Sequence, residues 1–306
     1  MSVTVREAVW RRDLPGYGCA GMVVVLWAGF SLASRFSARG GGVGLTAWDL
    51  GALRFSFAFV IAAGIWVAGG GRGLPVGRSF VLAMVGGFGF ALPSYAGFQF
   101  APAAHGGLIL SGALPFLVAA MGWMVLREPW TRGRWWSMGL LAVGFVLVGV
   151  EAYGQGRAPA GAWRGDLLFV FAASCWALYT VLARMWRPGP AQAIVAVGLW
   201  CGPFYMPVWW VGLPSHLGRE AWATAAWGEV AFQAVYQGVI AVVVSLWLFT
   251  RALAILGPSR LAAITALVPG VAAVGAVPLL GEPLGMMTVL GLGAVCGAVA
   301  VGARRG

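Results

Sequence analysis

The chain has 306 residues, of which 60% are hydrophobic and only 9% are charged. This composition excludes a water-soluble protein, because apolar runs of about 20 residues have the length that a helix needs to cross a bilayer. The net charge of +11 comes from 20 Arg and no Lys. Since these Arg lie between the apolar runs, they indicate topology control and contact with anionic lipid headgroups, and no nucleic-acid partner is expected.

Ten membrane-spanning helices are predicted from the apolar runs between Arg, Pro and Gly residues. The first half contains 16–36, 46–69, 79–101, 105–126 and 135–151. The second half contains 166–186, 190–212, 227–249, 259–280 and 285–302. The expected fold is an all-α polytopic membrane protein with a five-helix repeat at 1–151, a linker at 152–164 and a second five-helix repeat at 165–306.

The two halves resemble each other in sequence. Internal repetition at half length in an apolar chain is typical of secondary transporters. The equivalent residues are Pro115 and Pro269 and the pairs Glu128-Pro129 and Glu282-Pro283, all at an offset of 154, and Trp27-Ala28 and Trp176-Ala177 at an offset of 149.

The distribution of Arg predicts the orientation of the spans. With the N-terminus inside, 14 Arg fall on the inner side and five on the outer side, and Arg54 falls within a span. This bias predicts that both termini are cytoplasmic. Because each half has five spans, the second repeat then crosses the membrane in the opposite direction, which is the inverted architecture used for alternating access.

These features together resemble the drug/metabolite transporter superfamily, in its EamA-type branch. They are ten short spans, Trp-Ala in the first and sixth spans, and Pro-containing spans that end in Arg127-Glu128-Pro129 and Gly281-Glu282-Pro283. The resemblance covers essentially the whole chain. It implies a bacterial inner-membrane exporter of small metabolites, above all aromatic and other neutral amino acids, which we expect to work as a monomer without a cofactor.

The resemblance also implies where the substrate cavity lies. In this family the third, fourth, eighth and ninth spans build the cavity, and the first and sixth contribute to it. Sugar-phosphate exchangers of the superfamily rely on Lys and Arg in the cavity, so the absence of Lys disfavours a phosphorylated substrate.

Polar side chains in the third and eighth spans are candidates for binding the substrate, because a polar group in hydrocarbon needs a partner, a wet cavity or a ligand. Amides and phenols suit a neutral or zwitterionic ligand that carries an apolar side chain. Hydrogen bonding between spans is the alternative interpretation. The candidates are Ser94, Tyr95 and Gln99 in the third span and Gln233, Tyr236 and Gln237 in the eighth.

Aromatic residues occupy equivalent places in the first and sixth spans. Trp27 and Trp176 lie at mid-span, and Tyr179 follows three residues after Trp176. Tryptophan is more common at the membrane interface than at this depth. These side chains therefore either line the transport pathway or pack the two halves together.

Two prolines mark the fourth and ninth spans. Pro115 and Pro269 each remove a backbone hydrogen bond, so they are candidate hinges, with a static bend as the alternative. Ser111 and Thr265 lie four residues before them and are small enough to allow close approach of a helix or a substrate. Both are candidate substrate contacts.

Ionisable groups give few signs of chemistry. Arg54 follows Asp49 by five residues, and we interpret the two as a pair near the outer end of the second span; a functional intramembrane charge is the alternative. The sequence has no metal-ligand cluster, phosphate-binding loop or nucleophile–base pattern, so we expect no catalytic residue, metal or cofactor. A membrane-embedded enzyme is a distant alternative. A multidrug or hydrophobic-cation exporter is the nearer one, which the lack of a mid-membrane carboxylate disfavours.

Overall fold

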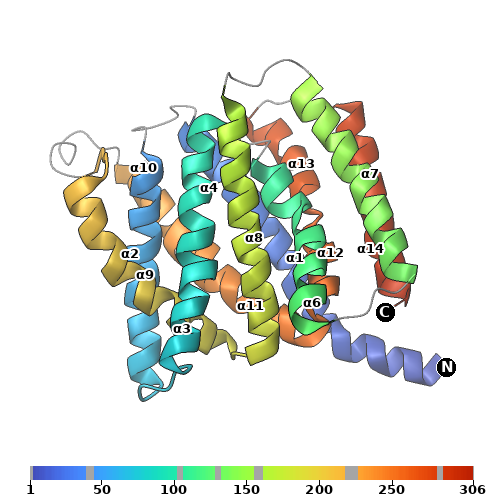
Figure 1. Cartoon of the computed structure of the whole chain (residues 1–306), viewed down its shortest axis with the longest axis horizontal. Coiled ribbons are helices and arrows are strands. Elements are labelled where there is room, and N and C mark those ends of the chain that lie inside the picture. Colours follow the sequence, from blue (N-terminus) through green and yellow to red (C-terminus); the bar gives the residue numbers. More distant parts are fainter. Residues whose placement is uncertain are drawn as a thin grey trace.

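A computed structural model describes residues 3–38, 45–101, 106–127, 132–154, 161–217, 227–280 and 285–305, and within these ranges the chain is a bundle of helices without β-strands (Figure 1). The first half contains α1 (Val3–Ala38), α2 (Ala47–Ala68), α3 (Val76–Ala83), the π-helical η1 (Met84–Phe88), α4 (Gly89–Phe100), the π-helical η2 (Leu108–Gly112), α6 (Leu114–Leu126) and α7 (Arg132–Gly154). The second half contains α8 (Ala162–Trp186), α9 (Pro190–Gly212), α10 (Trp227–Gln233), the π-helical η3 (Ala234–Val244), α11 (Ser245–Leu256), α12 (Pro258–Thr265), α13 (Val268–Leu280) and α14 (Met286–Arg305).

Eight of the predicted spans are confirmed, among the described residues, as helices long and apolar enough to cross a membrane. The third and eighth contain π-helical turns, as α3–η1–α4 and α10–η3–α11, and the fourth and ninth are broken, as η2–α6 and α12–α13. The predicted fifth and tenth spans form α7 and α14, whose apolar stretches, 135–151 and 289–298, are shorter than a full span. The all-α polytopic fold is confirmed, and the count of ten crossings stays a prediction.

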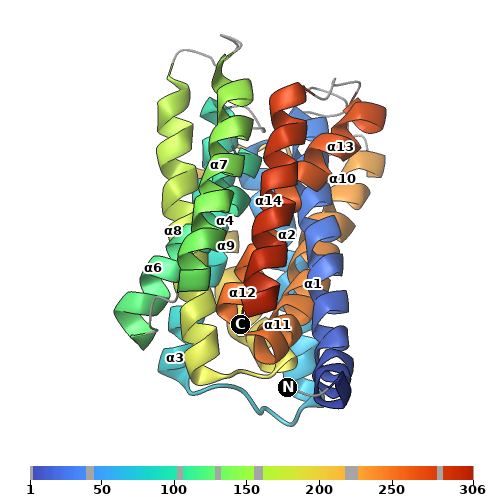
Figure 2. The same ribbon diagram turned by 90° about the vertical axis from the view of Figure 1, so that its right-hand side faces the viewer.

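The beginning of α1 and the end of α14 lie toward the same end of the bundle, which we call the N/C end (Figure 2). Most close helix pairs join the two halves of the chain: α7 runs beside α14, α2 beside α9, α4 beside α8 and α1 beside α11. The Glu-Pro motifs at 128–129 and 282–283, and residues 155–160 of the predicted linker, lie outside the described residues.

Glycines allow the π-helical part of the third span to lie against α8 and α9. A Cβ atom on Gly86 would lie 2.4 Å from Cδ2 of Tyr179, and one on Gly87 would lie 2.3 Å from the sulfur of Cys201. Both distances are below van der Waals contact, so a larger residue at either position would push the helices apart. This close packing positions Tyr179 beside the centre of the bundle.

Candidate substrate pocket

A narrow pocket opens at the centre of the bundle, where both halves of the chain meet. Its cavity volume is about 30 Å³, which is room for one or two water molecules in this conformation. Helices α1, α2, α4 and α8 and the segments η2 and η3 all contribute to it. The lining residues are Trp27, Phe30, Ser31, Arg54, Phe90, Leu110, Ser111, Trp176 and Ala241.

Aromatic rings form one wall of this pocket. The indole rings of Trp27 and Trp176 meet edge to face, with centroids 5.5 Å apart. Phe249 stacks on Trp27 at 5.5 Å, and Phe90 lies 5.0 Å from Trp176. The two equivalent tryptophans therefore both line the pocket and join the halves, so the two interpretations offered by the sequence are compatible. Tyr179 stacks on Trp176 at 4.9 Å, on the side of α8 toward the N/C end.

Arg54 supplies the positive charge of the pocket. It is only 7% exposed, and its guanidinium carbon lies 5.9 Å from the centroid of the Phe30 ring, beside the hydroxyl of Tyr95. Among the described residues no carboxylate forms an ion pair with it. The pairing of Arg54 with Asp49 that the sequence suggested is therefore not formed.

Asp49 has a different and complete set of partners. Its carboxylate accepts hydrogen bonds from Nε1 of Trp209 at 3.1 Å, from the backbone N–H of His216 at 3.0 Å and from the hydroxyl of Ser215. It also accepts from the backbone N–H of Thr46 at 3.0 Å, while the Thr46 hydroxyl accepts from the N–H of Asp49 in a reciprocal capping box. The residue thus anchors the start of α2 to the end of α9 and the segment that follows it.

The structure brings the polar candidates of the third and eighth spans close together. Most of their hydrogen bonds are made to one another or to α1, and they do not line the central pocket. The Tyr95 hydroxyl donates to Oε1 of Gln237 at 3.1 Å, and Nε2 of Gln237 donates to Oε1 of Gln233 at 3.1 Å and to the hydroxyl of Ser34 at 3.4 Å. Nε2 of Gln233 donates to the carbonyl of Ala33 at 3.1 Å. This chain, which we call the amide seam, joins α4, the eighth span and α1 with every member buried.

The remaining candidates of these two spans do not line the pocket in this conformation. The hydroxyl of Tyr236 donates to the carbonyl of Leu26 at 2.9 Å, and the hydroxyl of Ser94 donates to the carbonyl of Phe90 in its own helix at 2.6 Å. Gln99 is exposed near the end of α4.

The two candidate hinges lie at breaks in their spans. Pro115 falls in the first turn of α6, just after the break at Ala113, and Pro269 falls in the first turn of α13, just after the turn at 266–267. Ser111 lines the pocket. Thr265 is fully buried, and its hydroxyl donates to the carbonyl of Ala262 at 3.0 Å. Neither proline can donate a hydrogen bond to the carbonyl four residues earlier, which belongs to Ser111 or Thr265. That these breaks act as hinges stays a prediction.

Comparison with known proteins agrees with this architecture. Residues 163–302 match the EamA-like transporter family. This match covers 140 of the 306 residues, so the likeness to EamA-type transporters rests on the second half of the chain. The chain is also 24% identical over 161 residues to the uncharacterized transporter YyaM of Bacillus subtilis (strain 168), and this match covers 52% of each chain. The chain thus spans about half the length of this curated relative.

One solved crystal structure has the same fold over nearly its whole length. It superposes on this chain with a TM-score of 0.66 and 19% sequence identity, and the match covers 96% of each chain. The likeness concerns the fold alone. It extends into the first half of the chain, which the family match does not reach.

Sequence reasoning missed part of this central pocket. Arg54 carried a signal, because a charge inside a span is a functional candidate by default. Phe90 and Phe249 carried none, since one Phe among 17 in an apolar chain cannot be singled out by its type. Their place beside Trp176 follows from the packing of α4 and α11 against α8.

Proposed function

We propose that this protein exports small metabolites that carry a carboxylate and an apolar side chain, foremost aromatic and other neutral amino acids. The observation that carries this proposal is Arg54, a buried cation in a pocket walled by aromatic rings, which has no carboxylate partner among the residues that the structure describes. A buried guanidinium favours a bidentate anionic partner, and aromatic rings favour a flat or apolar side chain. A hydrophobic cation would meet repulsion at the same place.

Transport by alternating access between two inverted repeats is the mechanism we infer. Three features support it. The contact of α4 with α8 has a counterpart in the contact of α11 with α1, as expected when the halves are related by a twofold axis. The third and eighth spans both contain π-helical turns, and the fourth and ninth spans both break just before an equivalent proline. Two related halves around one central pocket suit a site that is exposed to each side in turn.

The expected topology can be tested by labelling. In a variant with its four cysteines replaced by alanine, Arg127→Cys should react with a membrane-impermeant maleimide only after the bacterial inner membrane is permeabilised. Met286→Cys should react in intact spheroplasts, because 14 of the 20 Arg favour cytoplasmic termini and five spans per half reverse the second repeat. Reaction of both cysteines from the same side would contradict the inverted arrangement.

The substrate class can be tested with purified protein in liposomes. We expect efflux of labelled Phe, Trp, Thr or Met above that from empty vesicles, and much slower efflux of phenylalaninamide, which keeps the ring but lacks the carboxylate. Equal rates for Phe and its amide, or a preference for tetraphenylphosphonium, would contradict a role for the carboxylate. Repeating the assay with and without a pH gradient identifies proton coupling.

A further inference from the structure

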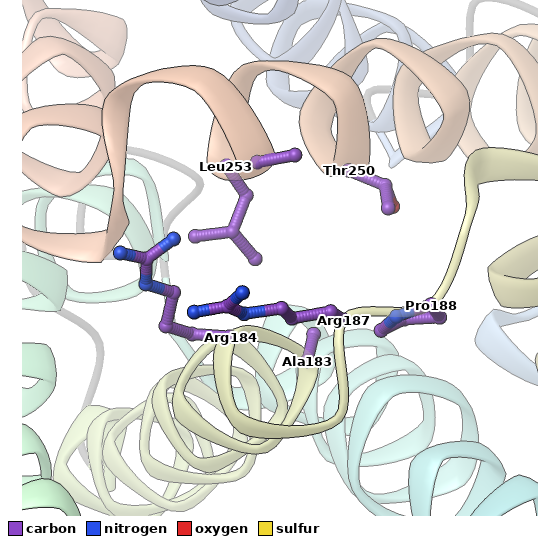
Figure 3. A pocket seen from close by; sticks show the side chains of 7 residues that line it. Ala183, Arg184, Arg187, Pro188, Thr250 and Leu253 are labelled. Carbon is purple, nitrogen blue, oxygen red and sulfur yellow. The ribbon is translucent and has the colours of Figure 1, made fainter.

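A second and larger pocket lies at the N/C end of the bundle, between the end of α8 and α11 (Figure 3). Its volume is about 180 Å³, against about 30 Å³ for the central pocket. Arg184 and Arg187 come from α8 and the residue that ends it, and Thr250 and Leu253 come from α11. The pocket is therefore built by two elements that also contribute rings beside the central pocket.

Two cations, Arg184 and Arg187, face this pocket. The guanidinium groups of Arg184 and Arg187 both extend along the side of the pocket that faces Leu253 (Figure 3). Neither forms an ion pair with a carboxylate in the part of the chain that the structure describes. Asp13, which is in α1, is already paired with Arg260 at 3.3 Å. Two like charges side by side favour a bound anion.

Among the described residues, three buried polar atoms without a hydrogen bond lie between this pocket and the central one. They are the hydroxyl of Thr250, the hydroxyl of Tyr179 and Nε1 of Trp176. The Thr250 and Tyr179 hydroxyls lie near each other, but outside hydrogen-bond geometry. Thr250 lines the pocket at the N/C end, and Trp176 lines the central one.

The spacing of residues along α8 explains why two of these three atoms, on Trp176 and Tyr179, lie on the same side of the helix as the pocket at the N/C end. Trp176, Tyr179 and Ala183 follow one another at intervals of three and four residues, so they share one face of the helix. Arg187 is the left-handed residue that ends α8, and it lines the same pocket as Ala183. A buried polar atom without a partner is costly, and such atoms commonly meet a ligand or water. All three can donate a hydrogen bond, which suits an anionic or carbonyl oxygen.

We propose that Arg184, Arg187 and Thr250 form a second anion-binding site, which holds the carboxylate of the substrate before it passes along Tyr179 and Trp176 to Arg54. This inference rests on the proposed function. The site is a loading station at the N/C end, and its ligand is a small carboxylate. A phospholipid headgroup offers similar anionic chemistry, so the experiment must separate the two sources.

The charge of the site can be measured without any transport. In the variant without native cysteines, Ala254→Cys places a thiol at the exposed edge of the pocket. Two labelling rates are measured for this thiol, one with an anionic (sulfonated) and one with a cationic (trimethylammonium) methanethiosulfonate, and each is divided by the rate for free cysteine. The normalised rate with the anionic reagent should be about tenfold higher, because two nearby guanidinium groups attract it. The preference should vanish in Arg184→Gln/Arg187→Gln. Equal relative rates in the parent protein would overturn the site.

The occupant is identified by protection and by kinetics. Phe, but not phenylalaninamide, should slow the labelling of Ala254→Cys in phosphatidylcholine vesicles. If added phosphatidylglycerol slows the labelling and Phe has no effect on it, the site binds lipid and the proposal is overturned. In transport, Arg184→Gln/Arg187→Gln should raise KM about tenfold for substrate presented at the N/C end and leave KM from the other side unchanged.

The two proposals fail in different ways. If the charge preference and the protection by Phe hold while no amino acid is transported, the anion site stands and the proposed function is wrong. If transport of Phe depends on Arg54 while Arg184→Gln/Arg187→Gln changes neither the labelling nor KM, the proposed second site is wrong and the proposed function stands.

Discussion

Replacing Arg54 with glutamine should lower kcat/KM for Phe by about 100-fold, because the carboxylate would enter a buried pocket without its counter-charge. Glutamine keeps a hydrogen-bond donor on a shorter side chain and loses the charge. Uptake and efflux of labelled Phe in proteoliposomes measure the effect in both directions. Efflux of phenylalaninamide, already slow, should change little.

The stability of this variant separates a binding role from a structural one. Arg54 is buried without an ion-pair partner among the described residues, so neutralising it should leave the melting temperature in detergent unchanged or raise it. Arg164→Gln is the matched control, since Arg164 lies at the start of α8 over the ring of Trp163 at 5.6 Å, away from the pocket. Wild-type transport by Arg54→Gln would rule out the proposed carboxylate contact.

Asp49→Ala, unlike Arg54→Gln, should destabilise the protein, lowering the free energy of unfolding by about 3 kcal/mol. The change removes the acceptor of the buried indole N–H of Trp209 and of the partly buried backbone N–H groups of His216 and Thr46. Unfolding in detergent micelles, followed by tryptophan fluorescence or circular dichroism, measures the loss.

A conservative replacement provides the control for Asp49. Asp49→Asn keeps one acceptor oxygen, so it should cost less than alanine, and any folded fraction should transport Phe with normal KM. A variant that is fully stable but fails to transport would show that Asp49 acts in the substrate pathway instead.

These two charges also show what the sequence could and could not predict. Residues five apart on an α-helix point about 140° away from each other. Asp49 and Arg54 therefore do not share a face, and the assumed pair could have been rejected from spacing alone. Apart from Thr46 in the capping box, the partners of Asp49 lie about 160 residues away in α9 and the segment after it, and no local pattern indicates them.

Helix positions were the most predictable part of the fold, because length and apolar composition decide whether a segment suits a bilayer. The breaks before Pro115 and Pro269 followed from the chemistry of proline, which cannot donate to the preceding turn. The hydrogen-bond partners of Tyr95 and Gln237 were harder to predict from the sequence. Their residue types suit a ligand and a neighbouring span equally well, and only the approach of α4 to the eighth span selects the neighbour in this conformation.

The amide seam also constrains how the molecule can move. Its hydrogen bonds lie where no water is at hand to replace them, so parting α4, η3 and α1 would carry a high activation enthalpy. The edge between α8 and α11 lacks such a chain: Thr250 and Tyr179 approach each other there without a hydrogen bond, and a cavity already separates the two helices. Separating the helices should therefore cost less between α8 and α11 than across the amide seam, and we expect the conformational change of transport to begin between α8 and α11.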